Sequence, residues 1–267
     1  MTTHTIQVPG ARLHYEVRGS GPLLLITGAP MDASAFEPFA DALAGDYTVV
    51  THDPRGISAS VLDDPEQDST PDLRADDLAA ILDALGAQDA EVFGSSGGAV
   101  SGLALVARHP SRVRTLVAHE PPVLELLPDA AEQRAETDAI IETFHREGMG
   151  AAWMKFMATA GFVGDDDGAP VPPPGEPSLQ DIANSARFFA HELRGTTRYL
   201  PDIAALKAGP ARVVVGVGAD SGNLSTYRTS AALADLLGSP TVEFPGDHGG
   251  FLGQPVEFAE VLRKVLA

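Results

Sequence analysis

Short apolar segments alternate along the chain with longer amphipathic ones. Eight segments are short and rich in aliphatic residues, as β-strands are: 4–8, 11–17, 23–27, 47–53, 90–94, 113–119, 212–218 and 241–244. Several are apolar almost throughout, which is typical of parallel strands buried on both faces. The first two are separated by Pro9 and Gly10 and predict an antiparallel hairpin.

The longer segments have helical periodicity. They span 33–44, 71–86, 97–108, 225–237 and 255–266. Within 71–86, Leu78, Ile81, Leu82 and Leu85 recur at spacings that place one apolar stripe against a sheet. The alternation predicts an α/β fold, with a mostly parallel eight-stranded sheet and helices on both of its faces.

The alternation is interrupted once, between residues 122 and 208. Helices are predicted over 129–147, 149–160 and 178–195, around a loop (163–177) too rich in Pro and Gly for a strand. We expect 122–208 to form a helical cap insertion and the core to comprise 1–121 and 209–267. Such a cap would cover the C-terminal edge of the sheet, where open α/β sheets bind ligands.

A strand–turn–helix is predicted around FGSSGGAV (93–100). In a nucleophile elbow the apex serine has a positive φ, and side chains two positions away on either side would collide with the neighbouring strand and helix. With Ser96 at the apex these positions hold Gly94 and Gly98, whereas Ser95 would place Phe93 at one of them. Sterics therefore select Ser96. The stretch lacks the Lys-Ser/Thr of a phosphate loop, but an ordinary glycine-rich turn remains an alternative.

The strand–GSSGG–helix, the TGAPMDAS loop (27–34), HDPRGISAS (52–60) and FPGDHGG (244–250) together resemble the α/β-hydrolase superfamily. The resemblance covers nearly the whole chain and is weakest in 122–208. The stretch from 93 to 122 is similar to that of zearalenone-type lactonases and related bacterial hydrolases and esterases. The resemblance implies an α/β-hydrolase fold and a catalytic serine.

His248 is the expected base for this serine. It follows the last predicted strand in a glycine-rich loop, and the order serine, then late histidine, is that of α/β hydrolases. His145 and His191 fall in the insertion and are further candidates for a pocket wall.

Two carboxylates are candidates for the acid that orients His248. Asp220 follows strand 212–218, one residue earlier than the superfamily pattern places its aspartate. Glu120 ends the strand after the nucleophile helix, and the zearalenone-type lactonases have a Glu in a similar His-Glu-x-Pro setting. We favour Glu120 and keep Asp220 as the alternative.

Acyl transfer also needs two backbone N–H groups directed at the developing oxyanion. Gly97, directly after the nucleophile, is expected to supply one. Gly28 or Ala29 is expected to supply the other, from a loop in which superfamily members often carry His-Gly where this chain has Thr27-Gly28. A βα turn that simply requires glycine would have the same sequence.

Apolar side chains recur at helical spacing in the insertion: Trp153, Phe156 and Met157, and in a second helix Phe188 and Phe189. Such residues either pack the cap onto the core or form an apolar roof over the nucleophile. The second possibility predicts a hydrophobic substrate.

Composition narrows the classes of function. The chain has 267 residues and no cysteine, which excludes disulfides and thiolate catalysis. Its formal net charge of −19 argues against nucleic acid and anionic membranes as binding partners. It lacks a long apolar run and a signal-like start, so a cytoplasmic location is expected. No metal-ligand spacing occurs, and the three aspartates at 165–167 are expected to be solvated; no metal or cofactor is expected.

These patterns favour a cofactor-free serine hydrolase that cleaves a small hydrophobic ester or lactone through an acyl-enzyme. The same groups could instead serve C–C hydrolysis, perhydrolase, or lyase or cyclase chemistry. A non-catalytic protein that binds a small molecule on this scaffold is a further alternative. The sequence does not determine the substrate or the oligomeric state.

Overall fold

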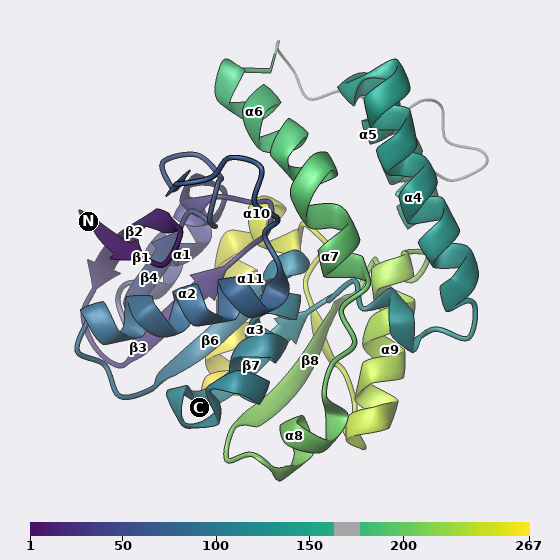
Figure 1. The fold of residues 1–267 in the computed structure, drawn as a ribbon. Coiled ribbons are helices and arrows are strands. Elements are labelled where there is room, and N and C mark those ends of the chain that lie inside the picture. The colour runs from purple at the N-terminus through teal and green to yellow at the C-terminus, as the bar shows by residue number, and fades with distance from the viewer. Residues whose placement is uncertain (163–176) are drawn as a thin grey trace.

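The computed structural model describes residues 1–162 and 177–267, in which nine strands form one sheet (Figure 1). The strands are β1 (Thr2–Val8), β2 (Ala11–Gly19), β3 (Leu23–Thr27), β4 (Thr48–His52), β5 (Val61–Leu62), β6 (Ala90–Ser95), β7 (Val113–His119), β8 (Arg212–Gly218) and β9 (Val242–Phe244). Their spatial order is β1-β2-β4-β3-β6-β7-β8-β9, and β5 pairs with β2. In this spatial order, β4, β3, β6, β7, β8 and β9 are each parallel to their neighbours within the group. The pairs β1–β2, β2–β4 and β2–β5 are antiparallel.

All eight predicted strands are present. The hairpin is confirmed by the antiparallel register of β1 and β2, from Thr2 opposite Val17 to Val8 opposite Ala11. The ninth strand, β5, was not predicted, because two residues are too few to establish a periodicity. The mostly parallel character of the sheet is therefore confirmed, with one strand more than expected.

Helices fill the connections between strands. They are α1 (Glu37–Leu43), α2 (Pro71–Ala84), α3 (Gly97–Arg108), α4 (Ala130–Glu147), α5 (Met149–Ala160), α6 (Leu179–Arg187), α7 (Leu193–Thr197), α8 (Ile203–Ala208), α9 (Ser225–Leu237), α10 (Gly250–Gly253) and α11 (Pro255–Leu266). Short 3₁₀ segments are η1 (Ala33–Phe36), η2 (Pro110–Arg112) and η3 (Leu124–Leu126), and a π-helical segment, η4 (Phe188–Glu192), joins α6 to α7. The single helix predicted over 178–195 is thus divided by a π-helical turn.

Successive residues of a strand point to opposite faces of the sheet, and here both faces are buried. In β6, Val92 belongs to the core formed with α2 and α3, whereas its neighbour Phe93 belongs to the core formed with α1 and α11. Helices therefore cover both faces, as predicted.

The segment between β7 and β8 has an apolar core of its own, formed by Ile140, Ile141, Ala152, Phe188, Phe189 and Leu193. Figure 1 shows α4, α5 and α6 on one side of the rest of the fold, above the strands. The loop predicted over 163–177 falls outside the described residues except for Pro177. None of the helices within 1–162 or 177–267 has the length and hydropathy needed to cross a membrane.

Candidate active site

Ser96 occupies the turn between β6 and α3, with φ 56° and ψ −125°. A Cβ atom at Gly94 would lie 2.6 Å from the carbonyl oxygen of Gly98, and one at Gly98 would lie 2.1 Å from that of Thr27. The steric need for glycine at these two positions is therefore confirmed. Ser95 is fully buried, with Oγ 3.5 Å from Nδ1 of His119, whereas Ser96 is partly exposed.

Glu120 directly follows β7 and is fully buried. Its Oε1 accepts a hydrogen bond from the backbone N–H of Gly218 (2.8 Å), and its Oε2 accepts one from the Thr226 hydroxyl (2.8 Å). Oε2 also lies 2.6 Å from Nδ1 of His248, in the loop between β9 and α10. An ionised carboxylate can only accept, so Nδ1 carries a proton and Nε2 of His248 is left free to take one.

The charges at this pair are set by burial and by the pair itself. Burial raises the pKa of Glu120, but the hydrogen bond and charge of His248 outweigh it and lower that pKa to about 2. Burial lowers the pKa of the adjacent His119 to about 3, so this second imidazole is neutral near pH 7. Glu120 is therefore a buried anion whose closest potential cation is the imidazolium of His248.

Asp220 makes no hydrogen bond to His248. The residue is exposed, and its carboxylate makes no hydrogen bond to any described residue. Only its backbone N–H is paired, with the carbonyl oxygen of Gly246. Of the two candidate acids, the structure brings Glu120 to His248.

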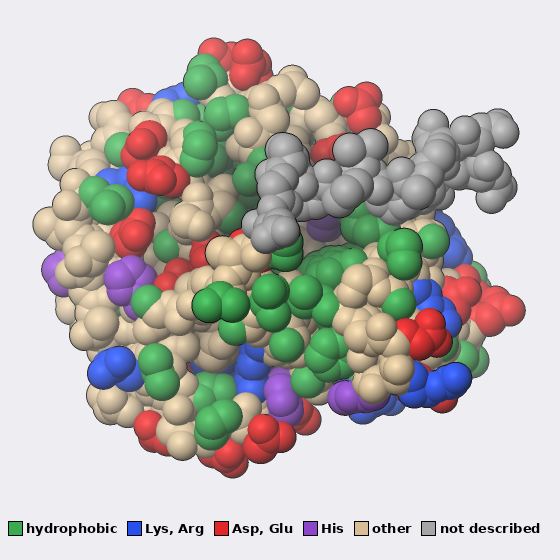
Figure 2. All heavy atoms as spheres, turned by 90° about the horizontal axis from the view of Figure 1, so that it is seen from above, with side chains coloured by type: hydrophobic (Ala, Val, Ile, Leu, Met, Phe, Trp, Pro, Cys, Tyr) green, Lys and Arg blue, Asp and Glu red, His purple; other side chains and the backbone are tan. Residues whose placement is uncertain are grey.

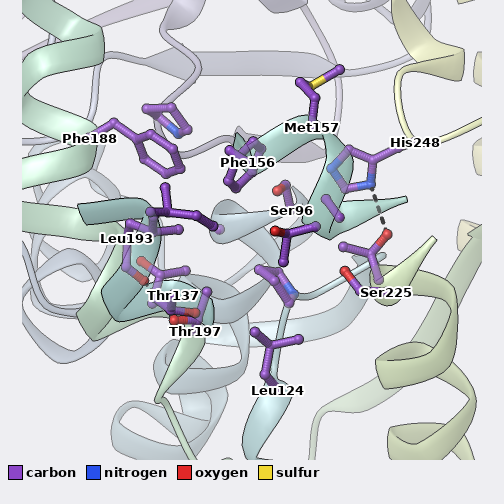
Figure 3. A pocket seen from close by; sticks show the side chains of 18 of the residues that line it. Ser96, Leu124, Thr137, Phe156, Met157, Phe188, Leu193, Thr197, Ser225 and His248 are labelled. Carbon is purple, nitrogen blue, oxygen red and sulfur yellow. Dashed lines mark hydrogen bonds between the residues drawn. The ribbon is translucent and has the colours of Figure 1, made fainter. Parts of the chain in front are cut away.

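Ser96 and His248 line one cavity of about 250 Å³ (Figure 3). Ser96 Oγ makes no hydrogen bond within the described residues; in ligand-free sites such contacts often tighten only when substrate binds. No Asp, Glu, Lys or Arg side chain is found among the described lining residues. Seen from above, hydrophobic side chains gather near the centre of this side of the molecule, and acidic ones lie scattered around them (Figure 2).

Four of the five predicted pocket residues line this cavity, namely Trp153, Phe156, Met157 and Phe188. Phe189 does not, which corrects the expectation for that residue. Phe189 is fully buried among the helices. The centroid of its ring lies 5.5 Å from that of Phe144 and 4.9 Å from that of Trp153. His145 and His191 are not in the wall of this cavity either.

Two backbone segments meet beside Ser96. Gly97 and Ala29 both line the cavity, and a Cβ atom at Gly97 would lie 2.7 Å from the carbonyl oxygen of Ala29. Neither Gly97 nor Ala29 donates its backbone N–H to another described residue. Gly28 is not in the cavity wall, and a Cβ atom there would lie 2.7 Å from the ring of Phe36. This arrangement favours Ala29 over Gly28 as the second donor.

Comparisons with known proteins agree with this architecture. A family profile described as the alpha/beta hydrolase fold matches residues 21–151. The uncharacterized hydrolase YraK of Bacillus subtilis (strain 168) is 37% identical over 268 residues, covering 98% of this chain and 95% of YraK. The chain belongs to the α/β-hydrolase superfamily.

Solved structures of an esterase and a lactonase match nearly the full length of the chain. A thermophilic esterase from Thermogutta terrifontis matches with a TM-score of 0.75 at 20% identity, covering 100% of this chain and 98% of the esterase. The enol-lactonase from Burkholderia xenovorans LB400 matches with a TM-score of 0.67 at 18% identity, covering 98% and 99%. At such identities the likeness concerns the fold.

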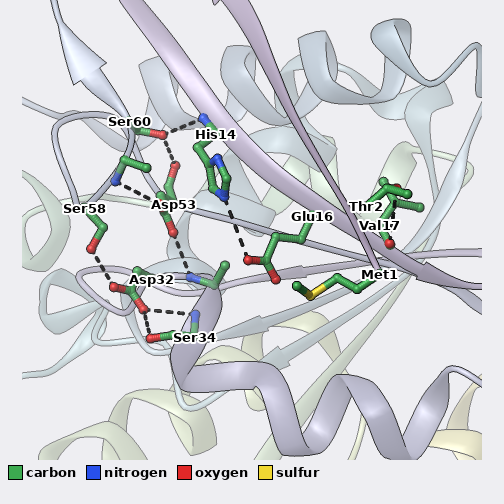
Figure 4. Close-up of polar contacts among 12 residues, drawn as sticks. Met1, Thr2, His14, Glu16, Val17, Asp32, Ser34, Asp53, Ser58 and Ser60 are labelled. Carbon is green, nitrogen blue, oxygen red and sulfur yellow. Dashed lines mark hydrogen bonds and ion pairs between the residues drawn. The ribbon is translucent and has the colours of Figure 1, made fainter.

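A polar network supports this α/β-hydrolase site and was not predicted (Figure 4). Asp53 accepts hydrogen bonds from the backbone N–H groups of Ala33 (3.0 Å) and Ala59 (2.9 Å). The Ser58 hydroxyl donates to Asp32 (2.5 Å) and accepts from the side-chain amide of Asn184 in α6 (2.9 Å). The network joins the loop that carries Ala29 to the loop after β4 and to α6.

The role of Thr226 as a hydrogen-bond donor to Glu120 was also not predicted, because the two residues are 106 positions apart and no local pattern marks Thr226.

No group of three or more His, Cys, Asp or Glu side chains suited to hold a metal occurs in the part of the chain that the structure describes. The three aspartates at 165–167 lie outside that part.

Proposed function

We propose that this α/β hydrolase is a serine hydrolase that cleaves a small apolar carboxylic ester or lactone through an acyl-enzyme. The observation that carries the proposal is the convergence of Ser96 and the His248–Glu120 pair on one largely apolar cavity. The backbone N–H groups of Gly97 and Ala29, which are not donated to any other described residue, support it. The volume of about 250 Å³ is below the range of about 300–1,000 Å³ typical of pockets for drug-sized ligands, which favours a small substrate.

In the first half-reaction Ser96 Oγ attacks the carbonyl carbon while Nε2 of His248 takes the hydroxyl proton. The electron pair of the carbonyl π bond moves to the oxygen, which the N–H groups of Gly97 and Ala29 stabilise. The tetrahedral intermediate then expels the alkoxide, which receives the proton from His248. Glu120 stays ionised and stabilises the imidazolium.

In the second half-reaction water gives a proton to His248 and attacks the acyl carbon. Collapse of the new intermediate breaks the bond to Ser96 Oγ, which takes the proton back from His248, and the carboxylic acid leaves. With a lactone, the alcohol remains attached to the acyl group, so the product is a single hydroxy acid. The Glu at this strand end is also what the similarity to zearalenone-type lactonases implies.

Hydrolysis of p-nitrophenyl butyrate and of a medium-ring lactone tests the proposal. Ser96→Ala should lower kcat by about 10⁴-fold or more, because it removes the nucleophile. Ser95→Ala is the matched control, since this neighbouring serine is buried and outside the cavity; its kcat should stay within a few-fold of the wild type. Full activity of the Ser96→Ala variant would refute the proposal.

A further inference from the structure

Four buried threonines line the cavity. Thr196 accepts a hydrogen bond from Arg74 and Thr226 donates one to Glu120, whereas Thr137 and Thr197 each donate to a backbone carbonyl of their own helix. Thr137 belongs to α4 and Thr197 to the end of α7, and these helices pack against each other. Both side chains line the cavity although the residues are only 4% and 6% exposed. Figure 3 shows them close together, with Ser96 separate from the pair. The pair therefore forms a polar spot in a wall that also contains Ile140 and Phe188.

The hydroxyls of Thr137 and Thr197 can only accept a further hydrogen bond. Thr137 Oγ1 donates to the carbonyl oxygen of Gln133, and Thr197 Oγ1 donates to that of Leu193, each at 2.9 Å. A hydroxyl has one proton, so each oxygen can offer a ligand only its lone pairs. The Gln133 side chain also lines the cavity; its amide donates one N–H to Asp129 (3.1 Å), so its Oε1 and its second N–H are both left for a ligand.

We propose that Thr137 and Thr197 select a substrate with a hydrogen-bond donor, a hydroxyl or an amide N–H, remote from the scissile carbonyl. A donor would satisfy the acceptor oxygens, whereas a second carbonyl or a carboxylate would face their lone pairs. An apolar group would fit the surrounding wall but leave the acceptors without a partner. The inference rests on the proposed function for the position of the reacting carbonyl at Ser96. The selected class is a neutral hydroxy- or amide-substituted ester or lactone.

The test measures ligand binding in a Ser96→Ala background, which prevents turnover. Trp153 is the only tryptophan of the chain and lines the cavity, so its fluorescence reports binding. Two probe pairs cover both orientations of an ester: methyl 6-hydroxyhexanoate against methyl hexanoate, and 6-hydroxyhexyl acetate against hexyl acetate. The quantity compared is the ratio of the two dissociation constants within each pair.

Thr137→Val with Thr197→Val should shift this ratio against the hydroxylated probe by about tenfold in at least one pair, because two acceptors are lost. Thr143→Val is the matched control. Thr143 makes the same kind of hydrogen bond in α4, to the carbonyl oxygen of Ala139 (2.7 Å), but is not in the cavity wall. Its ratio should equal that of the parent protein.

A change of less than twofold in both pairs would overturn the inference, as would an equal change in the Thr143→Val control. Thermal unfolding of the variants shows whether a lost fold explains weak binding, and the ratio is insensitive to the fraction of folded protein. Failure of the proposed function is seen separately, as hydrolysis that survives Ser96→Ala, while the binding ratio is still measured.

Discussion

Three hydrogen bonds hold the Glu120 carboxylate in a site that solvent does not reach. A buried carboxylate remains ionised only where donors and cations replace water. Here the donors are the Gly218 N–H, the Thr226 hydroxyl and Nδ1 of His248. Burial raises the pKa of Glu120, but the hydrogen bond and charge of His248 outweigh it and lower that pKa to about 2. The negative charge of Glu120 is therefore available to stabilise a protonated His248.

The charge at Glu120 gives a prediction at the residue scale. Glu120→Gln keeps the size of the side chain but removes the anion that stabilises the imidazolium and fixes its tautomer. It should lower kcat for p-nitrophenyl butyrate by about 10²–10⁴-fold. Asp220→Asn removes one negative charge from an exposed residue and should leave kcat within about twofold of the wild type. An active Glu120→Gln variant beside an inactive Asp220→Asn variant would reverse the assignment.

Some of the site could be predicted at this scale and some could not. The choice of Ser96 over Ser95 could be predicted from the glycines two positions before and after it, because this steric requirement involves only neighbouring residues. The preference for Glu120 came from strand-end position and resemblance. The contacts that hold its carboxylate span 98, 106 and 128 residues of chain, so no local pattern records them.

At the scale of elements, the turn between β6 and α3 brings three backbone segments together. The positive φ of Ser96 presents its side chain to the cavity, and the first turn of α3 packs directly on the end of β3. Glycine is required because neighbouring backbone atoms, which cannot rotate away, occupy the space of a Cβ.

The crowding at Gly98 predicts a large loss of stability. Gly98→Ala places Cβ 2.1 Å from the Thr27 carbonyl oxygen and should lower the free energy of unfolding by about 2–4 kcal/mol. Gly150→Ala in α5 is the control, because no atom lies within 4 Å of its Cβ position. It should leave stability unchanged or raise it by up to about 1 kcal/mol. Urea unfolding measures both, and equal stabilities would contradict the elbow packing.

Element boundaries were predictable where strong local signals stand at both ends. The prediction of 149–160 coincides with α5, which Gly148 and Gly161 flank at φ 92° and 90°. The division of 178–195 by η4 was not predictable, since a π-helical turn has the same composition as an α-helix.

At the scale of the whole molecule, the alternation of strands and helices was enough to predict the class of fold. It did not determine the spatial order of the strands or the cavity. The cavity wall combines strand-end loops with α4, α5 and α7, and these segments meet only in the folded chain. The boundaries of the predicted cap, 122 and 208, stay a prediction.

We expect this fold to activate Ser96 as a nucleophile. Incubation with a fluorophosphonate, followed by intact-mass and peptide mass spectrometry, tests it directly, because an inert serine does not react at a useful rate. We predict one phosphonyl group per chain, on Ser96, absent in Ser96→Ala and formed at least 100-fold more slowly in His248→Ala. An unmodified wild-type chain, or equal labelling of the Ser96→Ala variant, would show that Ser96 is not an activated nucleophile.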